Sequence, residues 1–369
     1  MLTAAIWGFG FVAQRSGMEY VGPFAFNGIR FILGSISLLP FIFIRRSRFA
    51  ADIRVVRKLQ FLNNFLVKTA VLQAESRKVA RLERQPTGLS LKSIVPSMQM
   101  LLPSFAAGSC LFIAVVLQQF GLLFTTAGNA GFITGLYVVF TPIVGIFLGR
   151  KTGLPTWIGS VLTLTGLYFI SAAGRSSVNP GDIITVISAL FWTAHVLLID
   201  RFMNVDIQRK ISVDPVELSA GQFAVCGILM LLGAFFIESH VIDVIEKINP
   251  SLLDKGLFEW QPFPALITAF KNGTMRFSFQ IIIPILYGGL CSVGIAYTLQ
   301  VIAQRDAPPA HAVIILCFEG CFAALGGVLL LAEKVGVWTL LGFVLMLAGM
   351  LSTQWEVIAG GTKLKKTAN

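Results

Sequence analysis

The sequence predicts an all-α integral membrane protein with ten transmembrane helices, arranged as two inverted five-helix repeats. Three observations support this fold class. Charged residues make up 13% of the 369 residues and hydrophobic ones 55%, with a mean hydropathy of +0.79, whereas a soluble domain carries about 25% charged residues. The apolar residues gather in ten long stretches. The two halves of the chain also repeat one pattern of aromatic residues and glycines.

Each predicted span holds about 20 mostly apolar residues, the length that an α-helix needs to cross a bilayer. Glycine and proline separate neighbouring spans, as at Gly22-Pro23 and Pro308-Pro309, because both residues interrupt helices. In chain order the predicted spans are 2–21, 23–44, 101–122, 128–149, 154–174, 183–201, 216–237, 281–303, 308–331 and 336–356.

Two polar inserts interrupt the spans. Residues 45–100 hold twelve Lys and Arg against three acids, and within 53–69 apolar residues recur at helical spacing beside basic ones. This pattern predicts either an amphipathic helix on anionic headgroups or a solvated helix that tethers two spans. The second insert, 238–280, holds four bases and five acids and has no clear period.

The basic residues predict the orientation of the chain. With the N-terminus inside, the cytoplasmic segments carry 21 Lys and Arg and the outer segments carry 6. Cytoplasmic loops of membrane proteins are enriched in these residues, so both termini are expected in the cytoplasm, in a plasma (inner) membrane protein. Because topology accounts for the net charge of +11, no nucleic-acid partner is expected.

Cysteine-accessibility labelling tests this topology. A cysteine in place of Glu75 should react only with reagent applied from the cytoplasmic side, and one in place of Lys255 only from outside, because five predicted spans separate the two positions. Labelling of both positions from the same side would contradict the span count, and with it the inverted repeat.

The internal repeat divides the chain into 1–174 and 181–356, followed by the cytoplasmic tail 357–369. Trp157 opens the fifth span and Trp338 the tenth. Each tryptophan is followed by two glycines, Gly159 and Gly166 or Gly342 and Gly349, and the spacing between the two glycines is the same in both spans. A repeat of five spans is odd-numbered, so the second copy enters the membrane upside down. Inverted repeats of this kind are typical of transporters, whose substrate site lies near the midplane between the halves.

Several motifs resemble EamA-type members of the drug/metabolite transporter superfamily. They are Ala5–Gly8, Ile29–Phe31, Thr126–Pro142, Phe318–Leu325 and Leu331–Lys334. The resemblance covers the chain except for the two inserts. It implies ten helices in two inverted repeats and the export of small metabolites, amino acids or drugs. It does not identify a substrate, because this family is functionally broad.

The residues offer no machinery for covalent chemistry. No P-loop sequence Gly-x-x-x-x-Gly-Lys-Ser/Thr occurs, so an ATP-driven motor is not predicted. The three histidines are scattered and the five cysteines all lie in apolar segments. Neither a metal site, nor a disulfide framework, nor a cofactor is therefore expected. A membrane-embedded enzyme would need clustered catalytic groups, so the protein is predicted not to be an enzyme.

Three charged residues stand inside predicted spans. An ionisable group in hydrocarbon costs about 2.5–3.5 kcal/mol on insertion scales and marks a candidate functional site. Glu319, in the middle of the ninth span, is expected to carry a proton or to bind a cationic substrate group, unless it is a structural buried acid. Arg30 and Arg15 would pair with a substrate carboxylate or snorkel outward as anchors. Arg15 also lies one turn from Glu19 and would pair with it.

Five further residues are candidates for substrate binding. Trp7 and Trp192 occupy equivalent positions in the two repeats and would either stack on an aromatic or cationic substrate or pack within the bundle. His195 follows Trp192 on nearly the same helical face, which predicts that this face lines the cavity. The resemblance adds Asn129 and Tyr137, because helices of this kind line the central cavity of the family.

These features predict a secondary transporter that moves a small organic metabolite, amino acid or drug, in the direction of export, by alternating access. The expected partners are this solute, membrane lipid, and a proton or counter-substrate that couples transport. The alternative is an uncoupled facilitator or channel for small solutes, which would show no dependence on Glu319.

Overall fold

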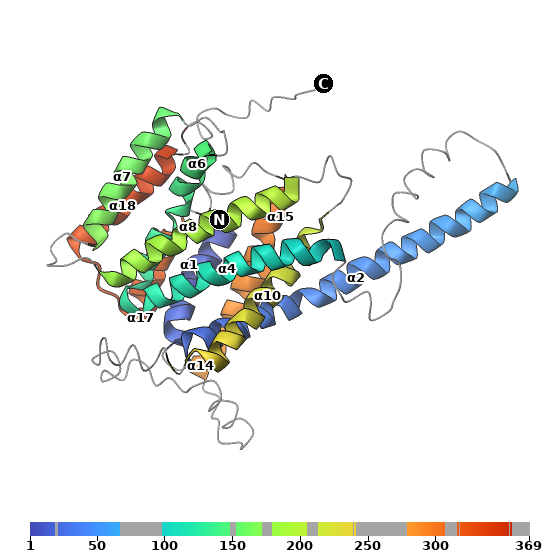
Figure 1. The fold of residues 1–369 in the computed structure, drawn as a ribbon, viewed down its shortest axis with the longest axis horizontal. Helices are drawn as coiled ribbons and strands as arrows, with labels where there is room; N and C mark the ends of the chain where they lie inside the picture. The colour runs from blue at the N-terminus through green and yellow to red at the C-terminus, as the bar shows by residue number, and fades with distance from the viewer. Residues whose placement is uncertain are drawn as a thin grey trace, which may run out of the picture.

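The computed structural model describes residues 1–18, 21–66, 98–147, 153–171, 179–204, 213–238, 240, 279–306, 316, 318–353 and 355. These residues form a bundle of helices and contain no strand (Figure 1). In chain order the helices are α1 (Leu2–Gly17), α2 (Pro23–Leu66), α4 (Met98–Phe124), α5 (Ala127–Thr134), α6 (Tyr137–Phe147), α7 (Leu154–Ser171), α8 (Pro180–Asn204), α10 (Pro215–Phe236), α14 (Phe279–Leu286), η2 (Tyr287–Tyr297), α15 (Thr298–Asp306), α17 (Glu319–Leu331) and α18 (Val337–Thr353).

Every predicted span contains helix, and six helical stretches in the described part of the chain are long and apolar enough to cross a membrane. They are Pro23–Arg45, Met100–Phe124, Ala127–Phe147, Pro180–Met203, Pro215–Phe236 and Ile281–Gln304. Three shorter apolar helices, Trp157–Ile170, Glu319–Leu331 and Val337–Ser352, coincide with further predicted spans. The protein is therefore an all-helical integral membrane protein, while the count of ten spans and the inverted repeat stay predictions.

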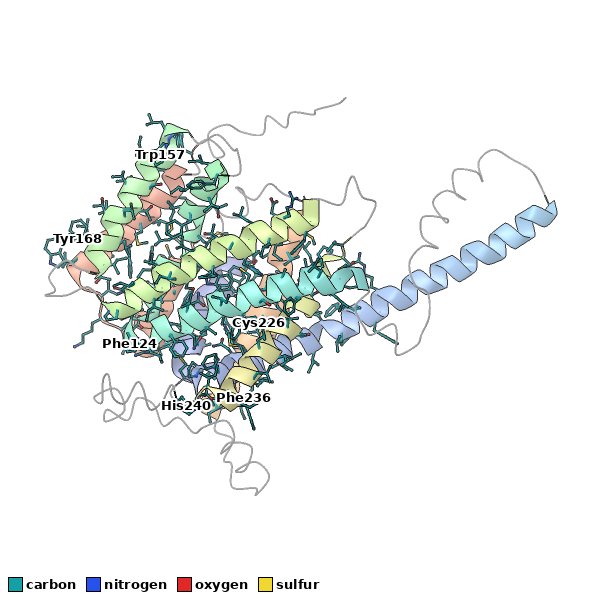
Figure 2. All side chains as sticks on the ribbon, in the orientation of Figure 1. Phe124, Trp157, Tyr168, Cys226, Phe236 and His240 are labelled. Carbon is teal, nitrogen blue, oxygen red and sulfur yellow. The ribbon has the colours of Figure 1, made fainter. Side chains whose placement is uncertain are left out.

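The distribution of side chains is that of a protein in lipid. Large apolar side chains face outward, and Phe147 and Leu102 are 86% and 73% exposed. Figure 2 shows Trp157 and Tyr168 on the outer side of α7. Polar side chains lie inside, among them the buried Arg30. Since a contiguous exposed apolar surface of this extent is foreign to soluble proteins, the outward face is the lipid-facing one.

The first insert begins as a continuation of the second span. The helical backbone of α2 runs from Pro23 to Leu66 through Pro40 and extends well past the other helices (Figure 1). As far as Leu66, the predicted helix over 53–69 is thus the end of a longer helix, while 67–69 lie outside the described residues. Its contact with headgroups or with solvent stays a prediction. Most of the second insert, positions 75 and 255, and the tail lie outside the described residues.

Helices α7 and α18 pair closely on one side of the bundle (Figure 1). A Cβ atom added to Gly342 would lie 2.7 Å from the carbonyl oxygen of Gly166, and one added to Gly349 would lie 2.6 Å from that of Gly159. Small residues permit this approach of two membrane helices. The two glycine pairs that match in the internal repeat therefore lie in one contact, between α7 and α18.

Candidate functional site

A cavity lies among the central helices, about halfway along them, since its lining residue Trp192 stands near the middle of α8. About 440 Å³ of it is not filled by protein atoms, a space that includes its open side. Helices α1, α2, α4, α5 and α6 line it from the first predicted repeat, and α8, η2, α15 and α17 line it from the second. The wall carries aromatic, amide and hydroxyl groups, one arginine and one glutamate.

Three aromatic rings from different helices form one wall of the cavity. The ring of Tyr297 lies 4.6 Å from that of Trp7 and stacks on that of Trp192 with centroids 5.9 Å apart. The indole of Trp7 donates a hydrogen bond to the carbonyl oxygen of Ser292 over 3.3 Å, which fixes its orientation. Rings at these separations attract one another, so the wall is a preformed surface for a flat or cationic group.

Arg30 is fully enclosed by the bundle. Its guanidinium lies over the rings of Phe31 and Phe26, with centroids at 5.1 and 5.7 Å, and donates to Gln14 Oε1 over 3.3 Å. A glycine at position 288 leaves room for its side chain, because a Cβ there would lie 3.2 Å from Arg30 Cδ. Cation–π contacts and one amide hold this cation in the described structure, which leaves its charge without a carboxylate.

Glu319 starts α17 and is 2% exposed. Tight contacts hold its turn between two helices. A Cβ added to Gly8 of α1 would lie 2.7 Å from the Glu319 carbonyl oxygen, and one added to Gly320 would lie 2.9 Å from the Cα of Phe132 in α5. Because backbones meet on both sides, the position of this carboxylate depends on the packing of α1 and α5.

Four buried polar atoms in the lining of this cavity have no partner among the described residues. They are Nε of Arg30, Nε1 of Trp192, Oε1 of Gln300 and Oε1 of Glu319. An unsatisfied buried polar atom costs about 1–3 kcal/mol, so such atoms are normally satisfied by water or a ligand. Two donors and two acceptors in the lining suit a solute that carries both kinds of group.

The structure brings five of the eight residues proposed from sequence to this cavity. Trp7, Arg30, Tyr137, Trp192 and Glu319 line it.

The other three lie elsewhere. Arg15 donates to the carbonyl oxygen of Leu122 in α4, an anchoring contact between helices. Asn129 is buried in the first turn of α5, where its backbone amide donates to the Thr126 hydroxyl over 3.1 Å. His195 shares a 2.9 Å hydrogen bond with Gln222 of α10. None of these three residues is therefore part of the cavity lining.

Phe11, Gln14 and Ser292 are among the lining residues that sequence reasoning missed. The amide of Gln14, one helical turn from Phe11 in a mostly apolar span, was a signal for that residue. For Ser292 no signal was available, because it lies in the π-helix η2, Tyr287–Tyr297. A π-helix changes the face that each residue presents, and such segments are frequent at functional sites.

A helical bundle in lipid, with a polar and aromatic cavity at its centre, has the architecture of a membrane transporter. The chain belongs to the EamA-like transporter family, whose model matches residues 1–77 and 179–354. The motif Thr126–Pro142 lies outside the matched residues, so the family rests on the other motifs.

Two relatives of the chain are named as transporters. It is 25% identical over 338 residues to an "uncharacterized transporter" of Archaeoglobus fulgidus, covering 90% of this chain and 77% of that protein. It is 20% identical over 351 residues to the "uncharacterized transporter YoaV" of Bacillus subtilis, covering 94% and 91%. A solved structure described as "crystal structure of protein" shares the fold, with a TM-score of 0.55 and 15% identity over 98% of this chain and 96% of that chain.

Proposed function

We propose that this protein is a secondary transporter that exports a small organic solute across the plasma (inner) membrane by alternating access. The observation that carries the proposal is the central cavity, whose wall combines an aromatic surface with unpartnered buried donors and acceptors. Both halves of the chain contribute to this wall, which suits a site that faces the two sides of the membrane in turn. Proton coupling through Glu319 supplies the driving force.

The wall chemistry suggests which solutes fit. The Arg30 guanidinium suits a carboxylate, since its Nε is unpartnered and arginine pairs with such groups bidentately. The rings of Trp7, Trp192 and Tyr297 suit a flat apolar part or a cation. Glu319 accepts an ammonium group or a proton.

Ligand-induced stabilisation of the purified protein tests this proposal. A bound solute raises stability by about 2.7 kcal/mol at a concentration 100 times its Kd, which is measured as a rise in melting temperature. Three compounds form a matched series: an α-amino acid with an apolar side chain, the same molecule without its carboxylate, and the same molecule without its amine. The two carboxylate-bearing members should stabilise the unmodified chain, and neither should stabilise Arg30→Gln.

Counterflow in proteoliposomes then separates a transporter from its alternative. A solute that stabilises the protein should exchange across the membrane and accumulate against its gradient when a pH gradient is imposed. Solute exchange without accumulation above the equilibrium concentration, under the same pH gradient, would favour the uncoupled facilitator. The absence of both stabilisation and counterflow, across a broad set of carboxylates and amines, would refute the proposed function.

A further inference from the structure

Two glutamates that the cavity does not use each bind the N-terminus of a distant helix. Glu238 follows the end of α10, is fully buried, and accepts hydrogen bonds on Oε1 from the backbone amides of Phe24 and Ala25 over 3.0 and 3.2 Å. These amides belong to the first turn of α2. The first amides of a helix lack partners within the helix and carry its positive dipole end, so a carboxylate is their favoured ligand.

Glu333 makes the same kind of contact between helices α17 and α5. It follows the end of α17 and accepts hydrogen bonds from the backbone amides of Ala127 and Gly128, in the first turn of α5, over 2.7 and 3.2 Å. Ala332 turns the chain with a φ of 53°, while the Glu333 amide donates to Gly327 over 3.0 Å. Alanine rarely adopts this left-handed conformation, so packing holds the turn that aims Glu333 at α5.

A glycine makes room for each carboxylate. A Cβ atom added to Gly22 would lie 2.2 Å from Glu238 Oε1, and one added to Gly327 would lie 2.2 Å from Glu333 Oε2. The three atoms nearest to each added Cβ all belong to the glutamate itself. The two contacts therefore share their parts: an acid after one helix, two amides that open another, and a glycine beside the carboxylate.

Both contacts join the first half of the chain to the second half. Helices α2 and α10 are antiparallel, because Glu238 meets the start of α2 and Arg45, further along α2, forms a 2.6 Å ion pair with Asp214, the N-cap of α10. Antiparallel packing also relates α5 to α17, since Gly128 lies against Ala324 and Gly131 against Gly320. In the predicted orientation, Glu238 and Glu333 both lie at the outer face and Arg45 lies at the inner face.

We propose that Glu238 with Gly22, and Glu333 with Gly327, are two latches that hold the outer face closed between the two halves of the protein. Opening of the cavity to the outside separates the starts of α2 and α5 from the ends of α10 and α17, and so breaks the four hydrogen bonds. The proposal rests on the proposed function in one respect: alternating access is the reason why the outer face opens. The contacts themselves are independent of the solute.

The protonation of Glu238 is linked to this opening. Burial raises its pKa to about 7, although the backbone amides of Ala25 and Phe24 lower it. Among the described residues, no Lys, Arg or His nitrogen lies within 4.0 Å of its carboxylate, and the nearest titratable group along the chain is the exposed His240. An exposed glutamate has a pKa of about 4.3. The closed latch therefore binds the proton more tightly, so acid favours closure and a rise through pH 7 favours opening.

Labelling of a cavity cysteine from outside measures the closure. Gln14→Cys, one turn from the outer end of α1, is placed in a chain whose five native cysteines are replaced by alanine, and an impermeant maleimide is added outside. Glu238→Ala and Glu333→Ala should each raise the labelling rate about tenfold, since each removes two hydrogen bonds to a charged group. Gly22→Ala and Gly327→Ala should act alike, because the three atoms closest to the added methyl all belong to the glutamate.

Matched variants separate the latches from general loosening. Glu238→Gln keeps an acceptor oxygen and should label as slowly as the unmodified chain at pH 6. Thiol ionisation raises the labelling rate of both chains between pH 6 and pH 8, and the rise should be smaller in Glu238→Gln than in the unmodified chain. Gly336→Ala, near Glu333 but with nothing within 4 Å of the added Cβ, and Arg45→Ala at the inner face should leave the rate unchanged.

Hydrogen exchange in the full chain with its native cysteines is the second measurement. Glu238→Ala should speed exchange at the start of α2, and Glu333→Ala at the start of α5, each without effect on the other helix. Unchanged labelling and exchange in these variants would overturn the latches, as would equal loosening by Gly336→Ala. Neither measurement needs a solute or a gradient, so a failure of the proposed transport would be seen separately.

Discussion

Replacement of Glu319 by glutamine is expected to abolish the dependence of net transport on a pH gradient while solute exchange persists. Glutamine has the shape and neutral charge of the protonated acid, so it keeps the contacts of that form but releases no proton. If one proton moves per solute, a gradient of one pH unit supports about a tenfold accumulation, because a factor of ten corresponds to about 1.4 kcal/mol. In Glu319→Gln this accumulation should fall to about one.

The reason lies in the position of this side chain. Glu319 lines the cavity at 2% exposure, and its Oε1 has no partner among the described residues. A lasting charge there is costly, so proton uptake and release should follow the side to which the cavity opens.

Glu319→Asp is the matched control, because it keeps the carboxylate but draws it back by one methylene. It should retain coupling at a lower rate. Uptake measured in proteoliposomes with and without a pH gradient checks both variants. Wild-type coupling in Glu319→Gln would mean that this acid is structural.

Replacement of Gly8 by alanine is expected to cause the largest loss of stability among single methyl additions near the cavity. The added Cβ would lie 2.3 Å from Phe322 Cβ and 2.8 Å from the backbone nitrogen of Ala323. Helix α1 and helix α17 would have to separate, and overpacking of this kind costs about 1–3 kcal/mol. The half-life of the folded protein in detergent at a fixed temperature should fall by about tenfold, since 1.4 kcal/mol corresponds to a factor of ten.

Gly10→Ala is the matched control on the same helix. Its Cβ would lie 3.5 Å from Ser292 Oγ, at ordinary contact distance, and alanine favours a helix over glycine by about 1 kcal/mol. This variant should be as stable as the parent or slightly more stable. Equal half-lives for the two variants would contradict the close approach of α1 and α17.

The spanning helices could be predicted from sequence because burial in lipid is a local demand. A run of about 20 apolar residues satisfies it, whatever the rest of the chain does. The same reasoning identifies Arg30 and Glu319, since a charge in such a run is costly enough to need a function or a partner. Glycine spacing indicated only the repeat, whereas the contact between Gly166 of α7 and Gly342 of α18 comes from the structure.

Uncharged polar residues could not be assigned in this way. Gln14, His195 and Asn129 all sit in apolar runs, and the local pattern does not say which face of each helix meets the cavity. His195 lies on α8 beside Trp192, but it turns to Gln222 of α10. Gln14 receives the hydrogen bond of Arg30 and lines the cavity.

The sequence by itself determined that the chain is a helical membrane protein of the transporter class, because hydropathy, charge balance and family motifs are local properties that do not depend on the tertiary structure. Only the tertiary structure decided which side chains share a space. Glu238 and Phe24 are 214 positions apart, and Glu333 and Ala127 are 206 positions apart, so no local period connects them. These acids meet helix N-termini because backbones packed through glycine bring the two halves into register, and such packing depends on all the helices at once.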